Sequence, residues 1–236
     1  MLLISKKPWR FLASSMVMPI LYLVTFGWGI GKGVMSSGTY LEFVLPGIIA
    51  LSAMNNSFGP VATSLNISKL YTKTLEEVLV SPVSAWDIAL GRTLTGLIRG
   101  FFSSLMILAV GMITGVSIHL SVLFFITIVL TGFCFGAAGV AAAMVTRTHE
   151  DMANFNSFFI IPMSFLAGTF FSPDNLPEPF RSIIIVYPLT HANLLLRGLA
   201  SNRDPSLTSL LILVAYAAFF FLLSVKLVKK GGVERN

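Results

Sequence analysis

The sequence is poor in charge and almost free of cysteine. Of its 236 residues, 11% are charged, one is cysteine and three are histidine. The single cysteine, Cys134, excludes an intrachain disulfide and a cysteine-based metal cluster. The histidines stand in three separate loops, so they cannot form the convergent set of groups that an intramembrane enzyme requires. The sequence therefore predicts no catalytic residue and no metal site.

A phosphate-binding loop is also absent. The spacing GxxxxGK[ST] occurs nowhere in the chain, so we expect no bound cofactor, and any ATP chemistry must come from another chain. The net charge of +6 does not indicate nucleic acid. No basic stripe with interleaved aromatic residues exists, and most of the Lys and Arg residues stand at the ends of apolar runs, as membrane orientation requires.

Long apolar runs take the place of charge. Hydrophobic residues make up 55% of the chain and the mean hydropathy is +0.85. A helix needs about 20 apolar residues to cross the hydrocarbon core. The sequence predicts an all-α integral membrane protein with one domain over residues 1–236 and six transmembrane helices. The predicted spans are residues 11–30, 41–65, 88–114, 121–145, 152–170 and 207–227.

The distribution of positive charge predicts the orientation. With six spans, eleven Lys and Arg residues fall on one side of the membrane and four on the other, while Arg99 lies inside a span. Positive residues favour the cytoplasm, so both termini are expected there. The inner set is Lys6, Lys7, Arg10, Lys69, Lys73, Arg92, Arg147, Lys226, Lys229, Lys230 and Arg235, and the outer set is Lys32, Arg181, Arg197 and Arg203.

The polar segment 66–92 is the longest that this count places in the cytoplasm. Its apolar residues fall near helical spacing, and its charged residues form an opposite face. Pro82 ends any helix because it lacks a backbone N–H. The segment predicts a short amphipathic helix along the inner membrane face, with a solvated connector as the alternative. The apolar set is Leu70, Leu75, Val78 and Leu79, and the charged set is Lys69, Lys73, Glu76 and Glu77.

Two motifs carry a resemblance to a known family. LEEVLVSPVSAWDIALGR at 75–92 and FLAGTFFSPDNLPEPFRSIIIVYPLTHANLLLRGL at 165–199 resemble the cytoplasmic and extracellular signatures of the ABC type-2 exporter permeases. The resemblance implies a cytoplasmic coupling helix between spans two and three that docks on an ABC ATPase subunit. It also implies re-entrant outer helices between spans five and six. The coupling residues so implied are Leu70, Leu75, Glu76, Glu77, Leu79 and Pro82.

Polar residues inside predicted spans are candidates for a pathway or gate. Asn55 and Asn56 lie near the centre of the second span, where they either line a route or dimer seam or form interhelical hydrogen bonds. Arg92 and Arg99 share a face of the third span. An arginine in mid-membrane needs a partner or water, so we expect a structural contact near the cytoplasmic gate, with substrate contact as the alternative.

Two further groups of residues leave alternatives open. The inner loop TRTHED at 146–151 could form a metal or proton site, but a charged turn is favoured. His191 and Arg197 could meet an anionic group, but solvated interfacial positions are expected. Small-residue faces at Gly96 with Gly100, and over 132–139, predict tight helix packing.

The sequence thus predicts the permease subunit of a bacterial ABC exporter in the cytoplasmic (inner) membrane. Its expected partners are an ABC ATPase subunit, a second copy or related permease, membrane lipid and an amphiphilic substrate, such as a drug, lipid-linked sugar or polysaccharide. A secondary transporter or channel not driven by ATP is the alternative. That class often has an inverted repeat and ionisable residues at mid-membrane in several spans. In this sequence only Arg99 is an ionisable residue at mid-membrane, and no repeat is evident.

Overall fold

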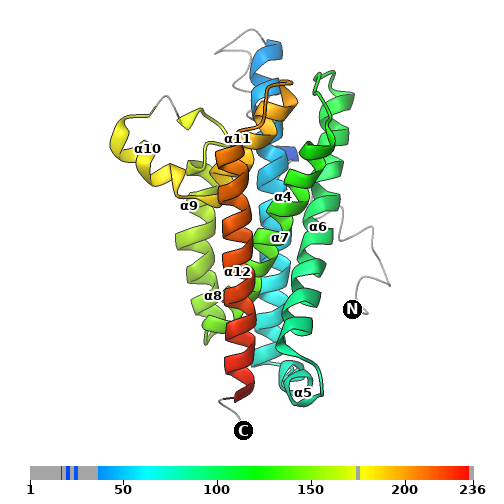
Figure 1. The fold of residues 1–236 in the computed structure, drawn as a ribbon, viewed down its shortest axis with the longest axis vertical. Helices are drawn as coiled ribbons and strands as arrows, with labels where there is room; N and C mark the ends of the chain where they lie inside the picture. The colour runs from blue at the N-terminus through cyan, green and yellow to red at the C-terminus, as the bar shows by residue number, and fades with distance from the viewer. Residues whose placement is uncertain (1–16, 18–19, 22–23, 26–36, 174–175, 234–236) are drawn as a thin grey trace.

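The computed structural model describes residues 17, 20–21, 24–25, 37–173 and 176–233, and in these residues all regular secondary structure is helical. Within the described residues, four helices are long and apolar enough to cross a membrane, and they run side by side (Figure 1). They occupy the positions of the second, third, fourth and sixth predicted spans. The first predicted span, 11–30, lies almost wholly outside the described residues. The four helices are α4 (Ser37–Leu70), α6 (Ala85–Ile113), α7 (Val122–Val145) and α12 (Leu207–Val233).

The fifth predicted span is divided and ends earlier than expected. It consists of α8 (His149–Phe155), the π-helix η2 (Asn156–Ile160) and α9 (Ile161–Leu166). Pro162 cannot donate the backbone hydrogen bond of a regular α-helix at this point. The helix then ends before Gly168, whose φ of 76° lies in the left-handed region that glycine favours after a helix.

Helix α4 forms the centre of the bundle. In its most apolar window, 83% of the residues are buried, compared with 28% for α12. Fully buried side chains such as Phe58 and Met54 fill the space toward the neighbouring helices. Pro46 and Pro60 both lie within this one continuous helix. Proline is tolerated there because neighbouring elements can satisfy the backbone groups it frees.

The predicted small-residue faces are confirmed as helix contacts. A Cβ at Gly100 of α6 would strike the Ser57 side chain and would lie 2.6 Å from the Ala53 carbonyl oxygen of α4. A Cβ at Gly139 of α7 would lie 2.9 Å from the Phe58 carbonyl oxygen. Three helices therefore approach one another at backbone distance, which only glycine allows at these positions.

Two short helices lie at the end of the bundle opposite α5 (Thr74–Val80) (Figure 1). They are α10 (Glu178–Ile185) and α11 (Pro188–Ala200), and they are bent by 91° at the break between them. Pro188 stands at the first position of α11, where its missing N–H costs no helical hydrogen bond. The arrangement agrees with the two short helices expected after the fifth span.

Candidate functional site

A short helix lies where the sequence predicted one between the second and third spans. Helix α5 has seven residues and follows Lys73, whose φ of 51° reverses the chain after α4. The chain becomes extended at Ser81, and the Ser81 hydroxyl donates to the Val78 carbonyl oxygen at 2.6 Å. Pro82 follows, so the helix cannot continue.

The inner face of α5 is buried against the ends of the long helices. Leu75 is 2% exposed and Leu79 is half-buried beside it. The cluster around Leu75 draws side chains from α4, α6, α7 and α12. These are Val61, Leu65, Ile88, Val140, Ala143 and Val228. Leu75 of α5 therefore belongs to one buried cluster with side chains of four spans.

The outer face of α5 is exposed. Glu77 and Pro82 are both exposed, and Val80 is 84% exposed. Leu70 and Glu76 are intermediate, with Leu70 at the last position of α4. The residues predicted from the sequence thus separate into an inward pair, Leu75 and Leu79, and an outward group around Glu77.

Four residues separate α5 from α6, and α6 begins at a capping box. The backbone N–H of Asp87 donates to the Ser84 hydroxyl at 3.2 Å, and the Ser84 N–H donates to the Asp87 carboxylate at 3.3 Å. The spacing S-x-x-D signals this box, but it was not predicted from the sequence. It fixes the length of the connection between α5 and the third span.

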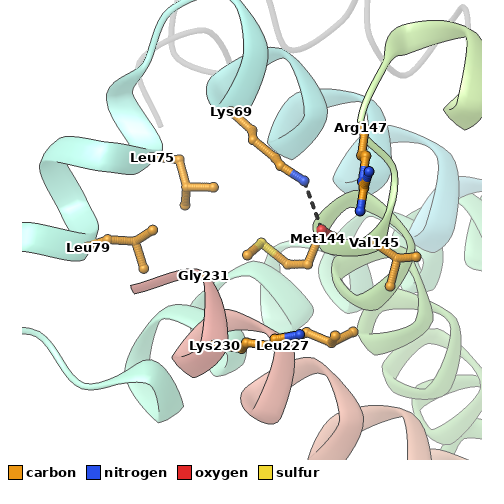
Figure 2. Close-up of a pocket in the computed structure, with 9 residues that line it drawn as sticks. All are labelled: Lys69, Leu75, Leu79, Met144, Val145, Arg147, Leu227, Lys230 and Gly231. Atoms are coloured by element: carbon orange, nitrogen blue, oxygen red, sulfur yellow. Dashed lines mark hydrogen bonds between the residues drawn. The ribbon is translucent and has the colours of Figure 1, made fainter. Parts of the chain in front are cut away.

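A pocket of about 360 Å³ lies beside α5 (Figure 2). Lys69, at the end of α4, donates its ammonium to the carbonyl oxygens of Met144 and Thr146, each at 2.8 Å. These are carbonyls of the last turn of α7 and of the residue that follows it, which have no partner within the helix. The pocket is lined by Lys69, Leu75, Leu79, Met144, Val145, Arg147, Leu227, Lys230 and Gly231.

The TRTHED loop is a capped turn. Asp151 accepts the backbone N–H groups of Arg147 and Thr148 at 2.9 and 3.0 Å, and the Thr148 hydroxyl accepts the Asp151 N–H at 3.0 Å. Among the described residues, no group of three His, Cys, Asp or Glu could hold a metal. The favoured alternative, a charged turn, agrees with this geometry.

This turn gives a pH-dependent prediction. The N–H groups of Arg147 and Thr148 hold the pKa of the Asp151 carboxyl below its ordinary value. Because the folded pKa is the lower one, the stabilisation is present above the ordinary value of about 3.9 and is lost as the pH falls below it. Asp151→Asn is therefore expected to flatten the fall in melting temperature over that acidic range, measured by thermal unfolding in detergent. Identical pH profiles for both proteins would contradict the assignment.

The two asparagines of α4 have different surroundings. Asn56 is buried, and its amide donates to the Ser52 carbonyl oxygen at 3.1 Å and to the Ser103 hydroxyl of α6 at 2.9 Å. This is the interhelical hydrogen bond that one of the two alternatives described. Asn55 is exposed, as are Asn154 and Asn156 in α8 and η2. Arg92 and Arg99 are both half-buried on α6.

The expectation of solvated positions for His191 and Arg197 is wrong. His191 is 4% exposed, and its Nε2 lies 2.9 Å from the Ile185 carbonyl oxygen. The Arg197 guanidinium donates from Nε to the Phe43 carbonyl oxygen at 3.0 Å and from Nη2 to the Thr169 carbonyl oxygen at 2.6 Å. Its Cζ lies 3.7 Å above the Phe43 ring. The planar guanidinium thus hydrogen-bonds to the backbone of α4 and to the chain after α9 at the same time.

Three further contacts hold the same segments together. The Asn193 amide donates to the Ala167 carbonyl oxygen at 2.9 Å and to the Thr169 hydroxyl at 3.2 Å. The Tyr40 hydroxyl donates to the Phe170 carbonyl oxygen at 3.2 Å. Helix α11, the chain after α9 and the start of α4 therefore form one polar junction at the end of the bundle away from α5.

Comparisons with known proteins agree with this architecture. Residues 1–200 match the family model described as ABC-2 type transporter. The chain is 28% identical over 234 residues to the inner membrane transport permease YadH of Escherichia coli (strain K12), covering 94% of this chain and 90% of YadH. It is 26% identical over 217 residues to Nodulation protein J of Bradyrhizobium diazoefficiens, covering 90% of this chain and 83% of that protein. This chain therefore belongs to the ABC-2 type transporter family and is a multi-pass permease of the inner membrane.

Proposed function

We propose that this chain is the transmembrane subunit of an ABC exporter, and that separate ATPase subunits drive it through α5. Two such chains, or this chain and a related permease, form the pathway for an amphiphilic substrate. Both termini and α5 lie in the cytoplasm. In support, the described ends of the bundle differ in charge: seven Lys and Arg residues gather at the α5 end and three at the other. The seven are Lys69, Lys73, Arg92, Arg147, Lys226, Lys229 and Lys230, and the three are Arg181, Arg197 and Arg203.

The observation that carries the proposal is the division of α5 into a buried and an exposed face. Leu75 belongs to a buried cluster with side chains from four spans, so a force applied to α5 reaches this cluster. The opposite face carries the exposed Glu77 and the 84% exposed Val80. An anchored helix with an exposed apolar and acidic face is suited to receive a protein partner.

The pathway is proposed to include the exposed polar side chains of the spans. Asn55 of α4, Asn154 of α8 and Asn156 of η2 are exposed polar side chains within the predicted second and fifth spans. Polar side chains at such positions are costly against lipid and acceptable against water or protein. A pathway at the seam between two copies gives them that environment.

The proposal is tested by placing a charge on the outer face of α5. Val80→Asp is expected to release the ATPase from a purified complex while the permease stays folded, because Val80 contacts solvent in the permease alone. Glu77→Ala combined with Pro82→Ala is expected to uncouple ATP hydrolysis from transport. The measurements are the ATPase retained on the affinity-purified permease and the substrate moved per ATP hydrolysed in vesicles.

Val122→Asp is the matched control. Val122 is 77% exposed and begins α7 at the opposite end of the bundle, so the same change there should leave the ATPase bound. If Val80→Asp retains the ATPase as well as Val122→Asp does, α5 is not the docking element. Transport by purified permease alone, driven by an ion gradient, would favour the secondary transporter instead.

The inner face of α5 gives a separate expectation. Leu75→Ala removes a buried side chain from this cluster, and such changes cost about 2–5 kcal/mol in well-packed cores. We expect a lower melting temperature of the permease and a weaker link between ATP hydrolysis and transport, with ATPase binding retained. A variant that keeps full stability would show that the Leu75 contacts do not attach α5 to the spans.

A further inference from the structure

The pocket beside α5 combines cationic and apolar walls. Arg147 and Lys230 are both exposed, and with Lys69 they bring three positive charges to one hollow (Figure 2). No Asp or Glu is among the lining residues that the structure describes. The Asp151 carboxylate, on the same loop as Arg147, accepts backbone N–H groups from Arg147 and Thr148. The lining as a whole is therefore positive.

The rest of the lining is apolar. Leu75, Leu79, Met144 and Leu227 face the hollow, and Val145, which is 63% exposed, continues it along the outside of α7 (Figure 2). The pocket lies where α4, α7 and α12 end, which is the level of the lipid headgroups for helices of this length. A ligand there would meet positive charge on one side and hydrocarbon surface on the other.

We propose that this pocket binds an acidic phospholipid. Arg147 and Lys230 contact the headgroup phosphate, and the acyl chains follow Val145 and Leu227. Lys69 adds positive charge while its ammonium donates to the carbonyl oxygens at the end of α7. Basic pockets between transmembrane helices are suited to such headgroups because the charge complements the phosphate and the neighbouring apolar surface receives the chains.

The bound lipid would connect α5 to the spans. The pocket has Leu75 and Leu79 of α5 on one wall and residues of α7 and α12 on the others. A lipid that fills it would restrain α5 relative to the ends of α7 and α12. The proposal requires that the protein spans a membrane, but it does not require an ATPase.

The first test measures thermal unfolding of the purified, full-length permease in detergent. Added phosphatidylglycerol is expected to raise the melting temperature of the wild type, and phosphatidylcholine at the same concentration is not. The double variant Arg147→Gln, Lys230→Gln should lose at least half of that shift. The matched control is Lys226→Gln, Lys229→Gln, which removes the same charge from exposed positions of α12 outside the pocket and should keep the full shift.

Three outcomes would overturn the proposal. Equal loss of the phosphatidylglycerol shift in both double variants would show general surface attraction. Equal shifts from both lipids would show that the headgroup charge has no role. An equal shift from inorganic phosphate would show a site for a free anion and not for a lipid.

A second measurement does not depend on the charge variants folding. Val145→Trp places a fluorescent side chain at the pocket edge, and brominated phosphatidylglycerol should quench it more than brominated phosphatidylcholine does, after subtraction of the wild-type signal. Equal quenching by the two lipids would contradict a specific site. Because neither measurement involves the ATPase, a failed coupling proposal would leave this result unaffected.

Discussion

Gly100→Ala is expected to lower the melting temperature of the permease by on the order of 5 °C, since overpacking a tight contact costs about 1–3 kcal/mol. The Ser57 side chain can rotate away from a new methyl group, but the Ala53 carbonyl oxygen, 2.6 Å from the Cβ position, belongs to the backbone of α4. The two helices must therefore move apart. Folded yield after gel filtration and thermal unfolding in detergent measure the effect.

Gly91→Ala is the control for this change. Gly91 lies on the same helix, and a Cβ there would have no atom within 4 Å. Alanine also has the higher helix propensity, by roughly 1 kcal/mol. The control should be as stable as the wild type or more so. If the two variants lose the same stability, the close approach of α4 and α6 at Gly100 does not explain the effect.

Arg197→Lys is expected to lower the free energy of unfolding as much as Arg197→Met does, although lysine keeps the positive charge. The planar guanidinium reaches the carbonyl oxygens of Phe43 and Thr169 together, and a single ammonium cannot reproduce that geometry. Hydrogen bonds from a charged donor contribute about 1.5–3 kcal/mol each, and relief of the buried charge offsets part of the loss in the methionine variant. We expect a net loss on the order of 2 kcal/mol for either change.

Hydrogen exchange locates the effect of these variants. Amides of residues 167–200 should exchange faster in both variants, while α6 and α7 stay protected. Arg181 provides the control pair, Arg181→Lys and Arg181→Met, because its contact with Glu178 at 3.7 Å lies at the surface, where an ion pair contributes little. Full recovery by Arg197→Lys would show that charge alone matters and would favour contact with an anionic substrate.

The long helices could be predicted from the sequence because their signal is local. Residues 122–145 form an uninterrupted apolar run, and the observed α7 agrees with the predicted span to within one residue at its start. The end of the fifth span was harder to predict from the sequence. Its apolar run continues to Phe170, but the helix ends at Leu166, where Gly168 takes a left-handed conformation that hydropathy does not report.

The polar contacts could not be predicted because they join residues far apart in the sequence. Arg197 and Phe43 are separated by 154 positions, and only the packing of α11 on α4 brings them together. For Arg197, charge alone indicated a solvated position, and burial reverses this. Similarly, the spacing of Leu75 and Leu79 predicted an apolar face for α5, but it could not show that the protein's own spans cover that face.

Helix α4 is fastened at both extremities by positive side chains. At one end, the Phe43 carbonyl oxygen accepts a hydrogen bond from the Arg197 guanidinium. At the other end, Lys69 of α4 donates to the Met144 carbonyl oxygen of α7. The whole of α4 has 34 residues, or about 50 Å at 1.5 Å per residue. A helix held at both ends would move as a rigid body. A tilt of α4 at its α5 end would therefore displace its other end at the same time, together with α11.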